Sequence, residues 1–450
     1  MFHIVSKYTY ICNKGKHCGS TPSEKTSVFL DDTKKILPFA TVDVSSLLIK
    51  IGTVMIDEHT RTFIREHAGD DVRQLALQAA RYPQVDMRVA VTQIEGRRLA
   101  TAKLPEWAAV DDIIYPVRLS MEQCSSETTA RYKASLVNGS KLADLTGGFG
   151  IDCSYMAKNF EDTTYIERND VLCHIAKHNF ALLGLPIKVI NGNSLEVLAT
   201  LPQQDWIFID PARRDESGNK VVALNDCDPD VCRIEHTLLQ KATMVMVKCS
   251  PMLDISLALS QLTSVSEVHA VSVNNECKEL LFILNGNVND TVSIHTMNFQ
   301  GGCTQAFDFM IEEEQEAHCS YTATIGRYLY EPNSSMMKVG CFRLPTQRYN
   351  LMKLHPNTHL YTADILIPNF PGRVFEVKSI DGFGKNELKR ISSGLKRANI
   401  AVRNFPDRPE TLRKRLKLAD GGDTYLFATT LYNGKKAIIC CTKATHVNLS

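Results

Sequence analysis

The stretch that decides the fold is Leu142-Ala143-Asp144-Leu145-Thr146-Gly147-Gly148-Phe149-Gly150. An apolar run ends in an acid and then passes through a glycine-rich turn into a segment of helix-forming length. Glycine allows a positive φ and lets a ligand approach the backbone closely. A phosphate-binding loop would carry GxGxxG, with the pyrophosphate at the N-terminus of the helix. Here Asp144 would repel phosphate but suit a positively charged cofactor; the alternative is a tight turn without a ligand.

From Lys141 on, short apolar runs alternate with segments of helix length. This alternation predicts a Rossmann-like α/β fold, a doubly wound and mostly parallel sheet with a ligand at the carboxyl ends of the strands. The last two strands follow one another closely, which indicates an antiparallel edge. We expect strands at 142–145, 164–166, 187–190, 206–209, 244–247, 268–273 and 280–284, and helices to about 159, at 171–183 and at 255–262.

Different patterns flank this predicted domain, to which we assign residues 139–286. Helix formers with apolar periodicity predict a helical N-terminal domain at 55–138, with helices at 71–81, 84–98 and 121–137. We expect a connecting segment at 287–372 and a small module of order β-α-β-α-β-β at 373–447. Residues 1–54 show no sustained helix or strand period. We therefore expect a disordered or non-native extension there; one hypothesis is that Met55 is the true start, and the alternative is a genuine flexible tail.

Two further polar positions follow predicted strands. Glu167 ends the second strand, where an acid is placed to bind the hydroxyl groups of a ribose; the alternative is an exposed charge at the start of a helix. Asn193 follows the third strand and could bind an adenine, although a plain turn explains it equally well. The predicted cofactor site therefore consists of Asp144, Thr146, Gly147, Gly148, Gly150, Glu167 and Asn193.

The fourth strand, 206–209, is followed by Asp210-Pro211-Ala212-Arg213-Arg214-Asp215. Proline fixes φ and stiffens the strand tip. Asp210 could accept a hydrogen bond from an amine or take a proton, and Arg213 and Arg214 could bind a phosphate or stack on a base. We predict Asp210, Pro211 and Arg213 as catalytic residues; the alternative is an Asp–Arg ion pair that holds a loop.

The cysteines and the apolar runs exclude several classes of protein. None of the 14 cysteines forms the paired CxxC spacing of a zinc site, so no metal site is predicted. Scattered cysteines in apolar segments are typical of a reducing compartment, and we expect a cytoplasmic protein. The sequence shows neither an apolar run of membrane-spanning length nor a secretory signal. Cys249 is a conceivable nucleophile, but a small buried thiol is the favoured interpretation.

Charge is distributed unevenly, although the net charge is only +1. Residues 371–450 hold 16 Lys and Arg against 7 Asp and Glu, whereas the rest holds 35 against 43. The basic run 413–417, with Lys389-Arg390 and Lys396-Arg397, predicts a polyanion-binding surface. A solvated charged face is the alternative.

The runs SMEQCSSE, LADLTGGFG, YIER, FIDPARRD, KCSPMLD and VNNECKELL resemble those of bacterial class I S-adenosylmethionine-dependent methyltransferases with a C-terminal THUMP-like domain. The resemblance covers about residues 60–445. It implies a ferredoxin-like segment near 328–372 and a THUMP-like module near 373–445. It also implies that Asp144, Gly148, Gly150 and Glu167 contact S-adenosylmethionine.

The same resemblance places residues 210–213 at the Asp/Asn-Pro-Pro-aromatic motif of amino methyltransferases. Ala212 and Arg213 depart from that motif, which puts methylation of an exocyclic amine in doubt. The 144–152 and 165–168 runs are also similar to a ribosomal guanine-N2 methyltransferase family.

Because THUMP domains generally bind RNA, the expected activity is methylation of a base in structured RNA, rRNA or tRNA. The alternatives are a protein or small-molecule acceptor, and a non-catalytic RNA-binding assembly factor that retains the fold. The oligomeric state stays open.

Overall fold

The computed structural model describes residues 56–213, 223–286 and 291–444. The extension predicted at 1–54 lies outside these residues, as do Arg214 and Asp215. None of the described helices is both long and apolar enough to cross a bilayer.

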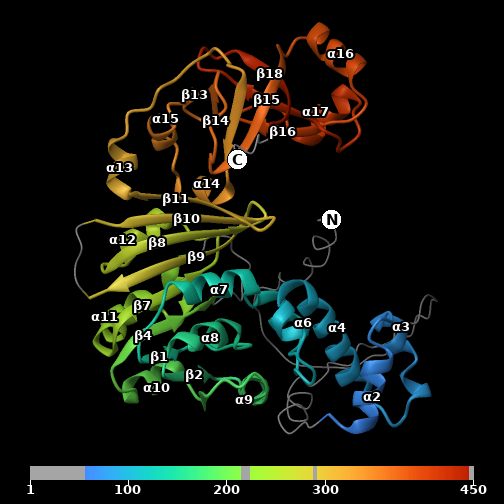
Figure 1. Ribbon diagram of the computed structural model, residues 1–450, viewed down its shortest axis with the longest axis vertical. Helices are drawn as coiled ribbons and strands as arrows, with labels where there is room; N and C mark the ends of the chain where they lie inside the picture. The colour runs from blue at the N-terminus through green and yellow to red at the C-terminus, as the bar shows by residue number, and fades with distance from the viewer. Residues whose placement is uncertain (1–55, 214–222, 287–290, 445–450) are drawn as a thin grey trace, which may run out of the picture. The chain divides into compact units, whose positions relative to one another are not determined.

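A nine-stranded mixed sheet forms the centre of the α/β domain (Figure 1). Its order is β11-β10-β8-β9-β7-β4-β1-β2-β3, and the five strands from β7 to β3 are mutually parallel. The predicted doubly wound α/β fold is confirmed. The strands are β1 (Lys141–Asp144), β2 (Asp162–Glu167), β3 (Ile187–Asn191), β4 (Gln204–Ile209), β7 (Ala242–Cys249), β8 (Val265–Val273), β9 (Glu276–Asn285), β10 (Ser293–Gln300) and β11 (Cys303–Met310).

The predicted antiparallel pair is present as β8 and β9, but it does not form the edge of the sheet. Strand β10 adds parallel to β8, and β11 pairs antiparallel with β10. The sheet therefore continues past the predicted boundary at residue 286. An unpaired β8 would expose a row of backbone N–H and C=O groups, and β10 covers that row.

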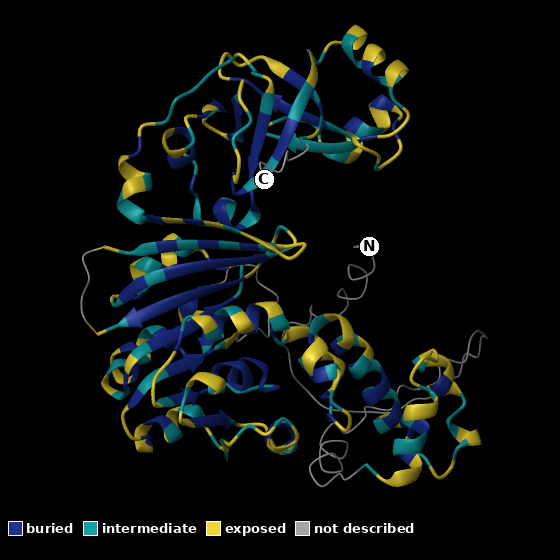
Figure 2. Ribbon diagram, in the orientation of Figure 1, coloured by how far each residue is buried: buried dark blue, intermediate teal, exposed yellow. Residues whose placement is uncertain are grey.

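Alternation of side chains along the strands gives the sheet two buried faces. Leu142, Phe208 and Met246 face one side, which α7 (Glu127–Ser135), α8 (Ile151–Met156) and α9 (Asp170–Leu182) cover. Ala143 and Ile207 face the other side. There they meet α10 (Ser194–Thr200), α11 (Val231–Lys241) and α12 (Ile255–Gln261). Figure 2 shows the buried strands between partly exposed helices.

The described residues before β1 form mainly helices, as predicted, but two of the three predicted helices are shorter than the sequence indicates. The predicted helix 71–81 is divided into α3 (Val72–Leu77) and a 3-10 turn (Ala79–Arg81). The predicted helix 121–137 starts only at Glu127, because the Ser126 hydroxyl accepts a hydrogen bond from the Thr129 amide and caps α7. The remaining helices are α2 (Glu58–Glu66), α4 (Met87–Lys103), α5 (Pro105–Ala108) and α6 (Arg118–Gln123).

The C-terminal part forms a second sheet of seven strands, in the order β13-β14-β12-β15-β18-β17-β16. The predicted β-α-β-α-β-β order of the last module is confirmed. Strand β12 pairs with β15, so the two predicted modules share one continuous sheet. The strands are β12 (Tyr328–Pro332), β13 (Met352–His355), β14 (Thr358–Ala363), β15 (Gly372–Asp381), β16 (Asn399–Arg403), β17 (Thr424–Thr430) and β18 (Lys436–Lys443).

Short helices join these strands. Helix α14 packs on β8 and β10, where the Ser334 hydroxyl bonds the Ser272 hydroxyl and Met336 enters the core of the first sheet. This contact joins the C-terminal part to the nine-stranded sheet. The helices are α13 (Ile311–Glu316), α14 (Ser334–Val339), α15 (Leu344–Arg348), α16 (Lys385–Gly394) and α17 (Pro409–Leu416).

Candidate active site

The sheet reverses its winding between β1 and β4, and this is where open α/β sheets bind ligands. A cavity of about 910 Å³ lies there, at the carboxyl ends of the parallel strands. That volume is within the usual range for a cofactor site. Nine predicted site residues line it together: Asp144, Thr146, Gly147, Gly148, Gly150, Glu167, Asn193, Asp210 and Pro211.

The loop after β1 needs its glycines. Gly148 and Gly150 have φ values of 55° and 86°, which side chains rarely tolerate. A Cβ on Gly147 would lie 2.1 Å from the ring of Tyr165, and one on Gly150 would lie 2.7 Å from Phe180. The Tyr165 hydroxyl donates a hydrogen bond of 2.6 Å to the Gly148 carbonyl. The loop is therefore held in one shape, close against β2 and α9.

Asp144 ends β1 and is only 1% exposed. Its carboxylate accepts a hydrogen bond of 3.0 Å from the Thr146 amide. Burial raises the pKa of Asp144 well above its usual value, and the nearby carboxylates of Asp152 and Asp210 add to the effect. A cation entering the cavity would relieve this cost, so the site favours a positively charged ligand.

Glu167 and Asn193 already hold backbone groups. One carboxylate oxygen of Glu167 accepts from the Gly148 amide at 3.0 Å, and the other accepts from the Asn169 amide at 2.8 Å. Each oxygen keeps a second lone pair that could accept from a hydroxyl group. The Asn193 oxygen accepts from the Leu195 amide at 2.9 Å and caps α10. A helix cap therefore explains Asn193 without any ligand, although the residue lines the cavity.

The loop after β4 is bound to the glycine loop. The Asp210 amide donates a hydrogen bond of 2.6 Å to the Thr146 hydroxyl. Lys248, near the end of β7, donates from its ammonium group to the Asp210 carboxylate at 2.6 Å. Beyond Pro211, β5 (Ala212–Arg213) pairs with β6 (Cys227–Asp228), and this short ribbon is not predicted from the sequence. The Arg213 backbone pairs there with Cys227.

A buried charge network lies beneath Asp210, and the sequence did not predict it. The ammonium group of Lys248 also lies 3.2 Å from Asp152 on α8. Lys133 on α7 is fully buried and binds both Asp152, at 3.2 Å, and Glu279 on β9. The network therefore joins α7, α8, β7 and β9 to the Asp210 loop.

The pKa values in this network follow from burial and charge together. Burial on its own would lower the pKa of Lys248, but Asp152 and Asp210 outweigh it and raise that pKa well above its usual value. Burial would raise the pKa of Asp152, yet the charges of Lys133 and Lys248 lower it to about 2. Lys248 and Asp152 are thus charged at neutral pH. Of the residues in this network, only Lys248 could be placed near the site from the sequence, because it follows a predicted strand.

The remaining candidates near the cavity have simple structural roles. Burial raises the pKa of Cys249 well above its usual value, so the group is a thiol and not a thiolate at neutral pH. This favours the interpretation of Cys249 as a small buried thiol. In the segment before α7, Ser126 caps that helix while Ser120, Gln123, Cys124 and Ser125 line the cavity.

A solved relative decides the family. A protein of Porphyromonas gingivalis W83, assigned provisionally as a methyltransferase, is 35% identical in sequence. The match covers 86% of this chain and 98% of that chain, with a TM-score of 0.78. This chain belongs to the S-adenosylmethionine-dependent methyltransferases. Uncharacterized S-adenosylmethionine-dependent methyltransferases of two Mycobacterium tuberculosis strains are 23% identical over 333 residues, 72% of this chain and 87% of theirs.

Two family models match the C-terminal part of this methyltransferase. Residues 328–371 match a ferredoxin-like domain, and residues 372–443 match a THUMP domain-like family. The expectation of a THUMP-like C-terminus is confirmed. Together these modules correspond to the second sheet, from β12 to β18.

The cavity fits S-adenosylmethionine, which carries positive charge on its ammonium and sulfonium groups and negative charge on one carboxylate. Gly148 lines the cavity, where a Cβ on it would have only the Thr146 carbonyl within 4 Å, and Asp144 is a buried carboxyl group with a raised pKa. Glu167 lies at the end of β2, where an acid can bind ribose hydroxyls. The residues that would hold the cofactor therefore belong to the loops after β1 and β2.

Proposed function

We propose that this methyltransferase methylates a base in structured RNA, rRNA or tRNA, with the basic THUMP-like module holding the RNA. The observation that carries the proposal is the surface of α16 and α17. These helices pack together over one core cluster. Their exposed basic residues, with those of the flanking loops, are Lys385, Lys389, Arg390, Lys396, Arg397, Arg408, Lys414, Arg415 and Lys417.

Several of these cations are available to a ligand. Arg390 and Arg415 have ion-pair partners in Asp381 and Asp407. Within residues 56–213, 223–286 and 291–444, no ion pair engages Lys389, Lys396 or Lys414. Unpaired, clustered Lys side chains can neutralise phosphates at low cost, which favours a polyanion over a plain solvated face.

At the catalytic end, we assign Asp210 and Pro211 to positioning the acceptor and Arg213 to an RNA phosphate. When bound, S-adenosylmethionine would supply an electrophilic methyl group. The acceptor atom of the base would give its electron pair to that carbon while the methyl–sulfur bond breaks, and S-adenosylhomocysteine would leave with the electrons of the broken bond. Where the acceptor atom carries a proton, the Asp210 carboxylate accepts its hydrogen bond and takes the proton as the new bond forms. Lys248 holds Asp210 in place for this step. Most of the rate enhancement comes from orienting the acceptor atom toward the methyl group.

The cofactor assignment and the cell compartment belong to the same proposal. Asp144, Thr146, Gly147, Gly148, Gly150, Glu167 and Asn193 are proposed to surround S-adenosylmethionine, since all of them line one cavity. None of the twelve described cysteines forms a disulfide, which supports a reducing compartment, the cytoplasm.

The test is incubation of purified protein with methyl-tritiated S-adenosylmethionine and total RNA from cells that lack the gene. We expect label in RNA that RNase removes. Asp210→Ala should abolish labelling while cofactor affinity, measured by calorimetry, stays near wild type. The mapped position of the label then names the base.

Two other outcomes would overturn the proposal in different ways. RNase-insensitive label in a cell extract would identify a protein or small-molecule acceptor. Cofactor binding with no transfer to any fraction, and an Asp210→Ala protein that still binds RNA and complements the gene, would identify a non-catalytic assembly factor.

A further inference from the structure

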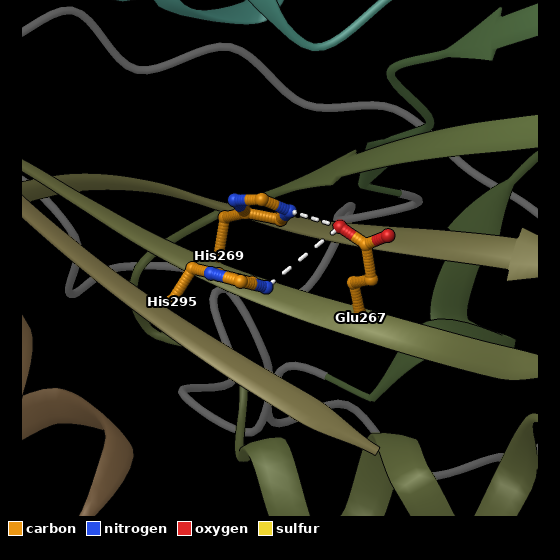
Figure 3. A group of neighbouring side chains, drawn as sticks. All are labelled: Glu267, His269 and His295. Atoms are coloured by element: carbon orange, nitrogen blue, oxygen red, sulfur yellow. Dashed lines mark hydrogen bonds and ion pairs between the residues drawn. The ribbon is translucent and has the colours of Figure 1, made fainter. Parts of the chain in front are cut away.

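Three potential metal ligands meet on the sheet face that α7 covers, away from the cofactor cavity. Strand β10 runs parallel to β8, and the register sets His295 directly beside His269. Glu267 lies two residues before His269, so its side chain shares the same face of β8. Figure 3 shows the two imidazole rings pointing nitrogen atoms at the Glu267 carboxylate. Nothing in the spacing of 267, 269 and 295 predicts this cluster from sequence.

The separations between the three ligand atoms are close to those found in metal sites. One Glu267 oxygen lies 3.0 Å from the His269 Nε2 and 3.9 Å from the His295 Nε2. All three ligand atoms lie within 4.8 Å of one another. Tetrahedral zinc, with bonds of about 2.0–2.1 Å, needs ligand atoms about 3.4 Å apart. The two Nε2 atoms, which lie at most 4.8 Å apart, would have to approach by up to about 1.4 Å, which a tilt of the two stacked rings can provide.

The outer nitrogen of each ring is already fixed by a partner. The His269 Nδ1 lies 2.8 Å from the Tyr132 hydroxyl on α7. The His295 Nδ1 lies 3.1 Å from the Asp308 carboxylate on β11. Metal-binding histidines almost always use the second nitrogen in this way, which orients the ring and strengthens the ligand. Both Nε2 atoms are thereby left to face Glu267.

Burial and access also suit an ion site. The His269 side chain is 3% exposed, whereas His295 and Glu267 are 29% and 39% exposed. One ligand is therefore rigidly held, and the other two give solvent access. The Ser293 hydroxyl lies 3.1 Å from the His295 Nε2 and would have to turn away, which a freely rotating hydroxyl can do.

We propose that Glu267, His269 and His295 bind one divalent transition-metal ion of the zinc class, with water as the fourth ligand. Two imidazoles and one carboxylate are a ligand set that zinc accepts and that magnesium and calcium disfavour. The ion would join β10 to β8 and, through Tyr132, hold α7 on the sheet. Its role is to stabilise the folded state, independent of the proposed methylation of RNA.

The experiment uses the full-length protein, treated with a chelator and dialysed, and titrated with Co²⁺ and then Zn²⁺. We expect one Co²⁺ per chain with the visible absorption of a tetrahedral site, displaced by Zn²⁺. Thermal unfolding should shift upward with Zn²⁺ but not with Mg²⁺, because only the folded chain holds the three ligands together. Chelator should reverse the shift.

Variants locate the site. His295→Ala and Glu267→Gln change half-exposed side chains, so the metal-free proteins should unfold near the wild-type temperature while losing the Co²⁺ spectrum. Asp308→Asn should keep the spectrum and weaken binding about 10- to 100-fold. The matched control is His236→Ala, an exposed histidine on α11 that contacts only Gln240 among the interactions of the described residues. It should bind as wild type does.

Two results would overturn this site. Intense thiolate-to-cobalt charge-transfer bands would place the ion on cysteines, such as the exposed Cys303. Equal Zn²⁺ stabilisation of wild type, His295→Ala and Glu267→Gln would show binding elsewhere. Failure of RNA methylation would leave the site untouched, since its readouts are spectra and unfolding.

Discussion

Charge is used in two opposite ways in this methyltransferase. Beneath the proposed cofactor cavity, Lys133, Lys248, Asp152 and Glu279 are buried and each charge meets an opposite one. On α16 and α17, by contrast, cations such as Lys389 stand in solvent. A buried pair is costly to break, whereas an exposed charge contributes little to folding but strongly to binding polyanions. The buried network holds the elements around the cavity in place, whereas the exposed cations form a surface suited to a polyanion.

The largest expected effect comes from breaking the buried network at Lys133. Lys133→Met would remove the cation between Asp152 and Glu279 and leave buried carboxylates short of a partner. Loss of one member of a buried ion pair typically costs about 3–5 kcal/mol. We expect a loss of that size in the free energy of unfolding, measured by urea denaturation.

The matched control is Lys177→Met, which removes an exposed lysine on α9. It should change the free energy of unfolding by no more than about 0.5 kcal/mol. If Lys133→Met were as mild as this control, the network would not stabilise the fold, and the contrast between the two regions would fail.

An intermediate effect on the free energy of unfolding is expected at Asp144, because burying its carboxylate without a nearby cation destabilises the folded state. Burial raises its pKa above the usual 3.8, so the folded state keeps the proton longer than the unfolded state. The contribution of Asp144 to stability therefore falls as pH rises above about 3.8. Asp144→Asn removes this loss and keeps an oxygen for the Thr146 amide. We expect a more stable protein at neutral pH, with the gain shrinking toward acid.

The same variant should bind the cofactor less well. Hydrogen bonds to charged groups contribute about 1.5–3 kcal/mol, so S-adenosylmethionine affinity should fall more than tenfold. Urea unfolding at about pH 5 and about pH 8, with calorimetric titration of the cofactor, measures both effects. A less stable Asp144→Asn protein at neutral pH would mean that the carboxylate is paired in the free enzyme, against the direction of its pKa shift.

The sequence predicted the parts of the site that depend on local order. The short apolar runs that alternate with segments of helix length predicted the parallel sheet, and the glycines before α8 marked a tight turn after its first strand. These features need only neighbouring residues, because a strand has a period of two and a turn needs particular φ values. Fold and loop could therefore be derived before the structure.

What could not be predicted depends on contacts between distant residues. Lys133 and Glu279 are 146 positions apart, and nothing local marks Lys133 as buried. The pairing of β10 with β8 was likewise missed, since an alternating edge strand at 293–300 is also compatible with a connecting segment. The Asn193 cap shows the reverse case, in which a polar residue suited to a ligand serves its own helix.

The smallest effect per residue is expected for the exposed lysines of α16 and α17. Replacing them tests whether this surface binds RNA. Lys389→Ala combined with Lys414→Ala removes one cation from α16 and one from α17. A cation that no longer neutralises a phosphate lowers the slope of log affinity against log salt by about 0.7–0.9, so the pair should lower it by about 1.5. Filter binding of structured RNA across a salt series measures this slope.

The matched control, Lys177→Ala with Lys188→Ala, removes two exposed cations from the catalytic domain. Unfolding should stay within about 0.5 kcal/mol of wild type for both pairs, since exposed charges contribute little to folding. An unchanged slope for the α16–α17 pair, or an equal decrease in the control, would remove the RNA-binding role from these helices and leave their charges as a solvated face.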